Sequence, residues 1–237
     1  MITQTKAKIF LADERGRNEI AWFRSYSTFN FGKYEHENKK AFGSLYVLND
    51  DTLAAGKSLR LYVEKDSYIL LIPVVGAIHY TDSNGNAASL HAGEVQLCNV
   101  QEGTTITVSN PYETETINFL HVWVRNNTFF SLPQTRTISC DINRHHNQLI
   151  TIVKPNNAFA ETYKPIIAMG KYDGRREGVF KLTKDTHMLF AFVIEGAFEV
   201  QSRLLHARDG LGLWDLDEVE FEALSNEAII LLIACER

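Results

Sequence analysis

Short apolar runs separated by turns dominate the first half of the chain. They cover residues 45–47, 59–63, 68–72, 76–80, 94–97, 105–108 and 117–124. Runs of this length are typical of strands rather than helices. Residues 82–86 read Asp-Ser-Asn-Gly-Asn and predict a tight hairpin turn, because Asn and Gly tolerate the positive φ angles that such turns need. Closely spaced strands joined by such turns predict a β-sandwich or a β-barrel.

The second half of the chain repeats this pattern. Its strand-like runs cover residues 149–153, 158–163, 166–169, 178–182, 187–194, 197–201, 210–213, 219–223 and 228–233. Gly76 and Gly196 each separate two apolar runs, and a further glycine follows each of them at a similar interval, at Gly93 and Gly210. We interpret the two halves as a duplicated β-barrel domain.

A looser, polar segment that contains Pro133 separates the halves. We expect it to be a linker over residues 126–144, between an N-terminal domain of residues 1–125 and a C-terminal domain of residues 145–237. The 237 residues of the chain are enough for two modest domains that each bury a core. An apolar fraction of 45% is ordinary for a globular protein and argues against disorder.

Charge and hydropathy exclude several classes of partner. The formal net charge is -5, and the densest basic spots, at residues 39–40 and 175–176, are too small for a nucleic-acid surface. No apolar run approaches the roughly 18 residues of a membrane span, and residues 1–9 lack the apolar core of a signal peptide. The three cysteines match no zinc or redox spacing, so we expect buried thiols and a cytoplasmic protein.

One spacing carries more specific information. The positions that define it are Gly56, Tyr62, Glu64, Tyr68, Gly76, Gly93, Gly103, Ile106 and Asn110. This is similar to the skeleton of the two cupin motifs, which is Gly, five residues, His-x-His, three or four residues, Glu and Gly, followed later by Gly, His and Asn. The glycines and the Asn stand in position, whereas the histidines do not.

The flanking segments narrow the family. Residues 24–25, 29–34, 42–51, 79–85 and 93–96 closely resemble the pirin family. Residues 208–215, Arg-Asp-Gly-Leu-Gly-Leu-Trp-Asp, are similar to the second cupin of bacterial pirin-like proteins related to quercetin 2,3-dioxygenase. The resemblance covers about residues 16–237. It implies an all-β fold of two tandem cupin barrels, each a double-stranded β-helix or jelly roll, which together form a bicupin.

The resemblance also implies a metal site that this sequence does not complete. Pirins hold one divalent metal, often iron, through a His-Pro-His and a later His-x-Glu, and these positions here are Tyr62, Glu64, Ile106 and Val108. Ile and Val offer no ligand atom, and a tyrosine ligates only as a phenolate, with an ordinary pKa of about 10. We therefore expect the four side chains to cluster inside the first barrel with no metal cofactor between them.

Neighbouring residues leave alternatives open. Arg60 and Tyr68 join the four as expected contacts of a ligand in the former metal site, although core packing is the simpler interpretation of Tyr62 and Tyr68. Glu64 is either an acid in the barrel mouth or, as we favour, the partner of Arg60 in an ion pair. A rebuilt metal site is a further alternative, and its nearest candidates are His79, His121, Glu113 and Glu115.

Other residues carry simpler expectations. We expect Trp123 and Trp214 in a core or at a domain boundary, Cys98 as an inert buried thiol, and residues 145–146, two histidines, as solvated parts of the linker.

Three functions remain in view. The favoured one is a metal-free pirin-like protein that binds an unidentified small molecule or protein partner, as a monomer or weak dimer. The alternative is a quercetin 2,3-dioxygenase-like enzyme with altered metal ligands, or with metal-free acid/base chemistry through Glu64. The third is a purely structural bicupin. Fold alone does not decide among them.

Overall fold

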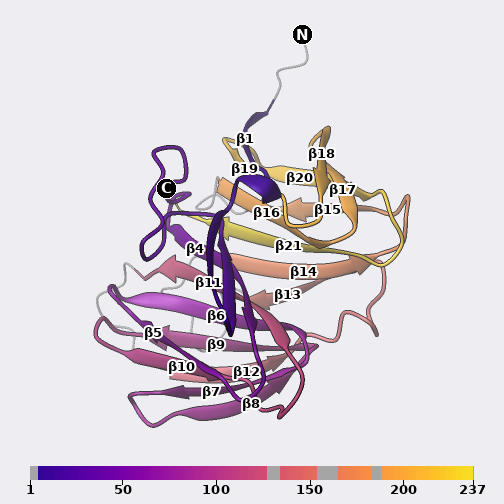
Figure 1. Cartoon of the computed structure of the whole chain (residues 1–237). Coiled ribbons are helices and arrows are strands. Elements are labelled where there is room, and N and C mark those ends of the chain that lie inside the picture. Colours follow the sequence, from indigo (N-terminus) through magenta and orange to yellow (C-terminus); the bar gives the residue numbers. More distant parts are fainter. Residues whose placement is uncertain (1–4, 127–133, 154–164, 183–187, 237) are drawn as a thin grey trace. The chain divides into compact units, whose positions relative to one another are not determined.

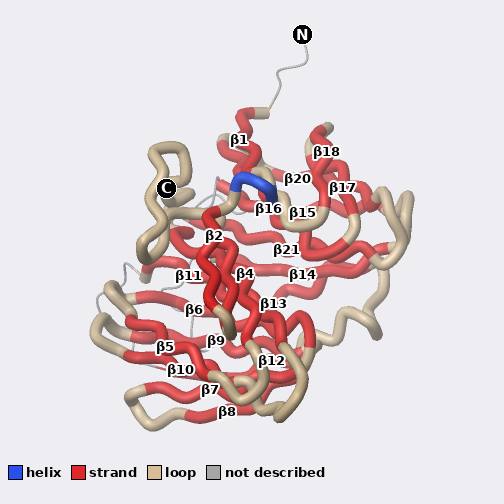
Figure 2. Tube along the Cα trace, viewed as in Figure 1, coloured by secondary structure: helices blue, strands red, loops and turns tan. Residues whose placement is uncertain are grey.

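The structure is a computed structural model that describes residues 5–126, 134–153, 165–182 and 188–236 (Figure 1). The described residues are almost entirely strands and turns, with a single 3-10 turn, η1 (Ala12–Glu14), as Figure 2 shows. The chain divides into two compact units, Gly16–Ser139 and the combination of Met1–Arg15 with Cys140–Arg237. The predicted all-β bicupin architecture is confirmed.

The first barrel consists of two sheets. The larger has the order β12-β9-β6-β11-β4-β3-β2 and the smaller has the order β5-β10-β7-β8. The strands are β2 (Gly16–Ile20), β3 (Phe23–Ser27), β4 (Leu45–Leu53), β5 (Ser58–Tyr62), β6 (Ser67–Val75), β7 (Ala77–Asp82), β8 (Ala87–His91), β9 (Glu94–Val100), β10 (Thr105–Ser109), β11 (Ile117–Arg125) and β12 (Gln134–Ser139). Alternate residues of both sheets face each other and form one apolar core.

The second barrel has the same plan. Its sheets have the orders β1-β19-β16-β21-β14-β13 and β15-β20-β17-β18. The strands are β1 (Lys6–Phe10), β13 (Gln148–Val153), β14 (Ile166–Tyr172), β15 (Glu177–Lys181), β16 (Met188–Glu195), β17 (Ala197–Val200), β18 (Arg203–His206), β19 (Gly210–Trp214), β20 (Glu218–Ala223) and β21 (Ala228–Cys235). Its core is also a single apolar cluster.

The strand registers bear out the predicted duplication. Gly76 joins β6 to β7 and Gly196 joins β16 to β17, with φ angles of +81° and +76° that favour glycine at both corners. When these glycines are aligned, the residues of β11 that pair with β6 correspond one by one to the residues of β21 that pair with β16. Both pairs of strands contain a β-bulge at the same position. Asn118 pairs with Val75 and Ile229 with Glu195, and each register shifts immediately afterwards.

The domain boundaries differ from those expected. β1 pairs with β19 and so belongs to the second barrel, where it is an edge strand. The equivalent edge strand of the first barrel is β12, which pairs with β9. β12 therefore belongs to the first barrel, although it lies in the expected linker, and residues 140–147 belong to the second. Residues 127–133 of that linker, and the strand expected at 158–163, lie outside the described residues.

Several strands were missed because their sequences are polar. β2 exposes four of its five residues, and β8 and β18 are half exposed. All three are edge strands, so only part of each strand contributes to a core and the apolar alternation is weak.

Candidate functional site

The four positions of the family's metal ligands do not come together. Ile106 and Val108 are fully buried in the core of the first barrel. Tyr62 is 61% exposed and Glu64 is also exposed, because Leu61 and Val63 take the inward positions of this segment. β10 pairs Ile106 with Leu61 and Thr105 with Tyr62, and directly paired residues share a face of the sheet. The expected cluster inside the barrel is therefore wrong.

The alternation of β5 explains the error. Leu59, Leu61 and Val63 are apolar, and the residues between them are polar or charged. Because successive side chains point to opposite faces, a strand with this pattern buries the odd positions and exposes the even ones. The resemblance placed residues 62 and 64 inside, whereas the hydrophobic pattern of this sequence places their neighbours there.

A cavity of about 690 Å³ opens beside this segment, and all of its lining residues belong to the first barrel. Arg60, Tyr62 and Glu64 border it. Among the described residues no ion pair joins Glu64 to Arg60, so the pairing that we favoured does not form. The rest of the lining comes from β2, β3, β4, β11 and the loop after β3, and includes Ser25, Ser27, Phe31, Lys33, Tyr46, Asp51 and Trp123.

A row of polar side chains lies on the inner face of the larger sheet next to this cavity. The register places Asp51 between Ser25 and Phe119, and Asn49 between Ser27 and His121. Asp51 is 1% exposed, and Asn49 and His121 are fully buried. Buried polar groups at the inner face of a barrel are unusual unless they are hydrogen-bonded.

Hydrogen bonds among the described residues do not satisfy this row. Nε2 of His121 lies 3.1 Å from Oδ2 of Asp51, which is close enough for an ion pair but does not meet the geometry of a hydrogen bond. No described residue forms a hydrogen bond with the side-chain nitrogens and oxygens of Asn49, Asp51 and His121 or with Nε1 of Trp123. Sequence reasoning had singled out His121 only as a metal ligand and had missed Asn49 and Asp51.

Aromatic rings surround the polar row. The ring centroid of His121 is 5.7 Å from that of Phe31 and 5.9 Å from that of Trp123. Trp123 also makes an edge contact with Tyr46, with centroids 6.1 Å apart. Phe31, Tyr46 and Trp123 all line the cavity together with Asp51. The site is therefore a carboxylate set among aromatic side chains.

The remaining predicted site residues lie elsewhere. Tyr68 is buried, but on the opposite face of β6 from Ile69 and Leu71, which belong to the barrel core, so it does not contact the cavity. His79 is exposed and hydrogen-bonds to Ser89 at 2.7 Å. Two further candidates, Glu113 and Glu115, are also exposed, whereas His121 is fully buried. The metal site considered from these residues is not assembled.

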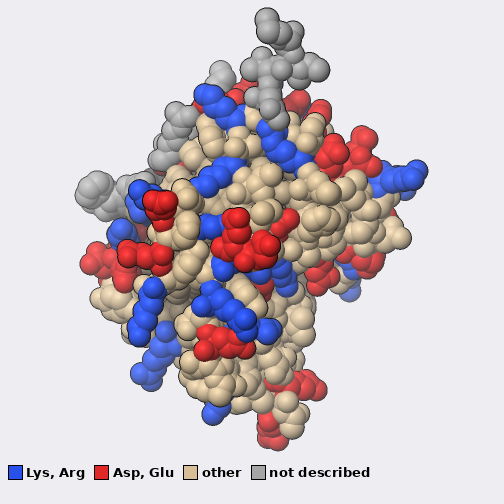
Figure 3. Space-filling view, turned by 45° about the horizontal axis from the view of Figure 1, so that its top comes forward, with Lys and Arg blue, Asp and Glu red and all other residues tan. Residues whose placement is uncertain are grey.

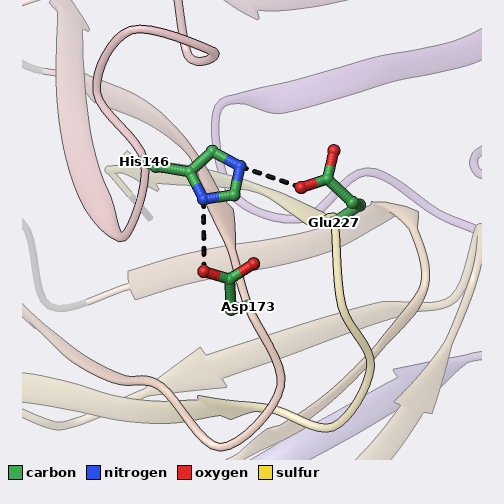
Figure 4. Close-up of side chains that lie close together, drawn as sticks. All are labelled: His146, Asp173 and Glu227. Carbon is green, nitrogen blue, oxygen red and sulfur yellow. Dashed lines mark ion pairs between the residues drawn. The ribbon is translucent and has the colours of Figure 1, made fainter.

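A second charged cluster lies in the second barrel (Figure 4). Nδ1 of His146 is 3.4 Å from Oδ2 of Asp173, and Nε2 is 3.0 Å from Oε1 of Glu227. Glu227 also pairs with Lys171, whose hydrogen bond keeps the pKa of Glu227 below its usual value. A hydrogen bond from Asn147 similarly lowers the pKa of Asp173. His146 is therefore an ion-paired residue of the barrel, not the solvated linker residue that we expected.

The geometry of this cluster favours an ion-pair network over a metal site. The two carboxylates face different nitrogens of one imidazole ring, so the ring bridges them (Figure 4). A single ion would use only one of those nitrogens, and Lys171 already adds a positive charge at Glu227. The cluster is the only group of three potential metal-ligating side chains found among the described residues.

The three cysteines are buried and form no disulfide, as predicted. Burial raises the pKa of Cys98 to about 12 and that of Cys140 to about 11, so neither is a reactive thiolate at neutral pH. Trp123 is 1% exposed and packs in the first-barrel core, also as predicted.

The surface shown in Figure 3 carries acidic and basic side chains intermixed rather than one continuous basic area. Among the described residues, no helix is long and apolar enough to span a membrane.

Comparisons with known proteins agree with this fold. Residues 10–124 match the Pirin family model, and residues 166–234 match that of the quercetinase C-terminal cupin domain. A quercetin 2,3-dioxygenase of Escherichia coli K12 is 26% identical over 229 residues, which cover 93% of this chain and 95% of the relative. A pirin-like protein of Caulobacter vibrioides is 25% identical over 227 residues, covering 94% and 97%.

Solved structures show the same architecture. The crystal structure of YhhW from Escherichia coli superposes with a TM-score of 0.85, at 21% identity, over 98% of this chain and 99% of YhhW. A second structure of YhhW, described as a bacterial pirin in complex with nickel(II), also gives a TM-score of 0.85, at 20% identity. At this identity the likeness establishes the fold.

Proposed function

The chain is a pirin-like bicupin. We propose that its first barrel binds a small molecule in the cavity beside β5, without the metal site of its family. The observation that carries the proposal is the cavity of about 690 Å³ with a buried carboxylate in its wall. Ligand sites are concave, mostly apolar, and contain a few polar groups that fix orientation. The aromatic side chains around Asp51 match that description.

The chemistry of the four family positions supports the metal-free part. Ile106 and Val108 lack ligand atoms, and Tyr62 and Glu64 lie on the other face of the strand. The second barrel offers an internal comparison. Val219 occupies the position that corresponds to Ile106, and Phe221 the position that corresponds to Val108. Both are apolar residues buried in the core of the second barrel. The first barrel has apolar core residues where its family would hold an ion.

The second candidate function is an enzyme. One relative is a quercetin 2,3-dioxygenase, and Asp51 with His121 provides a buried carboxylate–imidazole pair that acid/base chemistry could use. Glu64, the residue we had considered for this role, is exposed at the border of the cavity. We favour binding, because His121 does not line the cavity and only Asp51 does. We place the protein in the cytoplasm, since its three buried cysteines form no disulfide.

The test uses a panel of small aromatic compounds and saturation-transfer NMR on the full chain. Ser25→Phe fills the cavity beside Asp51, and Ser58→Phe adds the same ring to an exposed position of β5 outside the cavity. We expect ligands of the wild type to be retained by Ser58→Phe and lost by Ser25→Phe. Ligands that bind all three proteins equally would contradict the cavity assignment. Oxygen-dependent turnover of quercetin by the wild type with added nickel or iron would instead establish the enzyme.

A further inference from the structure

The duplicated barrel shows which residues the fold requires. When β6 is matched to β16 through the shared corner glycine, the partners of Leu71 and Ala191 correspond. His121 then matches Leu232, Asn49 matches Ala168, and Asp51 matches Gly170. The second barrel therefore forms the same sheet with small or apolar residues in all three places. The polar row of the first barrel is not a requirement of the fold.

Without a ligand, this row is unfavourable. A buried carboxylate must give up its hydration, and the cost is recovered only when hydrogen bonds or opposite charges replace the water. Oδ2 of Asp51 has His121 at 3.1 Å, whereas Oδ1 has no comparable neighbour among the described residues. Arg17, Lys33 and Arg60 line the same cavity, but none of them pairs with Asp51. Among the described residues, the buried carboxylate of Asp51 therefore lacks the hydrogen bonds that would replace its hydration.

The surroundings of Asp51 identify that group. Phe31, Tyr46 and Trp123 line the cavity with it. The face of an aromatic ring attracts a cation, most strongly when the cation is desolvated, and a carboxylate adds a charge-assisted hydrogen bond. Aromatic rings beside a buried carboxylate thus favour a positively charged nitrogen over a neutral or anionic group.

A bare metal ion fits less well. Asp51 and His121 are two donors, and no described His, Cys, Asp or Glu forms a group of three with them. Transition-metal sites in proteins usually have three or more protein ligands.

We propose that the cavity of the first barrel binds an organic cation, a protonated amine or amidine on a small apolar body. The charged nitrogen pairs with the carboxylate of Asp51, and the body packs against Phe31, Tyr46 and Trp123. This inference rests on the proposed function of the cavity and names the class of its ligand.

The experiment compares three probes of nearly equal shape by isothermal titration calorimetry at neutral pH: phenethylamine, which is a cation, 2-phenylethanol, which is neutral, and phenylacetate, which is an anion. The wild type is expected to bind the amine about tenfold or more tightly than the alcohol, and the anion more weakly still. Equal affinity for amine and alcohol would overturn the inference and leave the cavity as a small-molecule site. Failure to bind any probe would overturn it as well.

Two charge-removing variants locate the effect. Asp51→Asn removes the buried charge with little change in shape and is expected to abolish the preference for the amine. Glu113→Gln removes the same charge from an exposed position outside the cavity and is expected to retain the preference. Loss of the preference in Glu113→Gln, or its persistence in Asp51→Asn, would refute the role of Asp51. If Asp51→Asn does not fold, Ser25→Phe, which fills the cavity beside Asp51, takes its place and is expected to abolish binding of the amine; unchanged binding would refute the site.

Discussion

Replacing His121 by leucine should destabilise the first barrel strongly. Leucine occupies the corresponding position of the second barrel, at Leu232, so the substitution suits the fold. It removes the only group among the described residues that lies within ion-pair distance of Asp51, whose side chain is 1% exposed. A buried ion pair broken by the removal of one partner costs about 3–5 kcal/mol, because the remaining charge is left without compensation. We expect a loss of that size in the free energy of unfolding.

Removing both partners should restore stability. In Asp51→Ala/His121→Leu neither member of the buried pair remains, and replacement of a buried pair by apolar residues is often neutral or stabilising by about 1–4 kcal/mol. Asp51 borders an existing cavity, so alanine widens that space rather than opening a closed one in the core. The double variant should therefore be more stable than His121→Leu alone and lie within about 1 kcal/mol of the wild type, or above it.

The assay must report on the first barrel alone. Trp22 and Trp123 lie in the first barrel and Trp214 in the second, so a Trp214→Phe background confines tryptophan emission to the first. Urea unfolding of the wild type, Asp51→Ala, His121→Leu and the double variant in this background gives the cycle of free energies. A His121→Leu variant as stable as the wild type, or a double variant less stable than either single variant, would refute the claim that the polar row is present for a ligand.

Three further predictions concern other parts of the molecule. Ile106→Ala should lower the free energy of unfolding by about 2–5 kcal/mol, and Tyr62→Ala by less than about 0.5 kcal/mol. Equal losses of stability in thermal unfolding would contradict this prediction, because they would mean that the two side chains are equally buried. The cysteines, including Cys98 with its pKa of about 12, should resist a thiol reagent at pH 8 in the native protein and react in urea; rapid native labelling would contradict the burial. Glu227→Gln should destabilise the second barrel at pH 7, but by less as the pH falls below about 4.5, which is the ordinary pKa of that carboxyl. The hydrogen bond from Lys171 lowers the pKa of Glu227 in the folded state. The stabilisation by this carboxylate is therefore present above the pKa of the unfolded state and is lost when the group is protonated. A difference that stays constant down to pH 3, followed by circular dichroism, would contradict it.

The fold was predictable because it depends on repeated local patterns. The corner glycines Gly76 and Gly196, the hairpin at 82–86 and the apolar runs each indicate the same architecture, and their agreement fixes the duplication. Polar edge strands such as β2 were not predictable, because they contribute little to a core. The exchange of β1 into the second barrel was hidden as well, since strand pairing between distant segments leaves no local signal.

Of the predicted site residues, Arg60, Tyr62 and Glu64 border the candidate cavity, whereas Tyr68, Ile106 and Val108 do not. The family motif directed attention to Tyr62 and Ile106, although the alternation around Leu61 already opposed that assignment. Asp51 lies in a run of consecutive polar residues at the end of a strand, which reads as a turn in the sequence. Only the register, which sets Asp51 beside Phe119 on the inner face, reveals a buried carboxylate.

We propose that the first barrel binds its ligand without a metal. The most direct test is the metal content of the full chain, purified without chelators and measured by plasma mass spectrometry, with the nickel-binding bacterial pirin YhhW as positive control. His146→Ala is measured alongside, so that any ion held in the second barrel is recognised. We expect no stoichiometric transition metal in either the wild type or the variant. About one iron, nickel or copper per chain that persists in His146→Ala would contradict it.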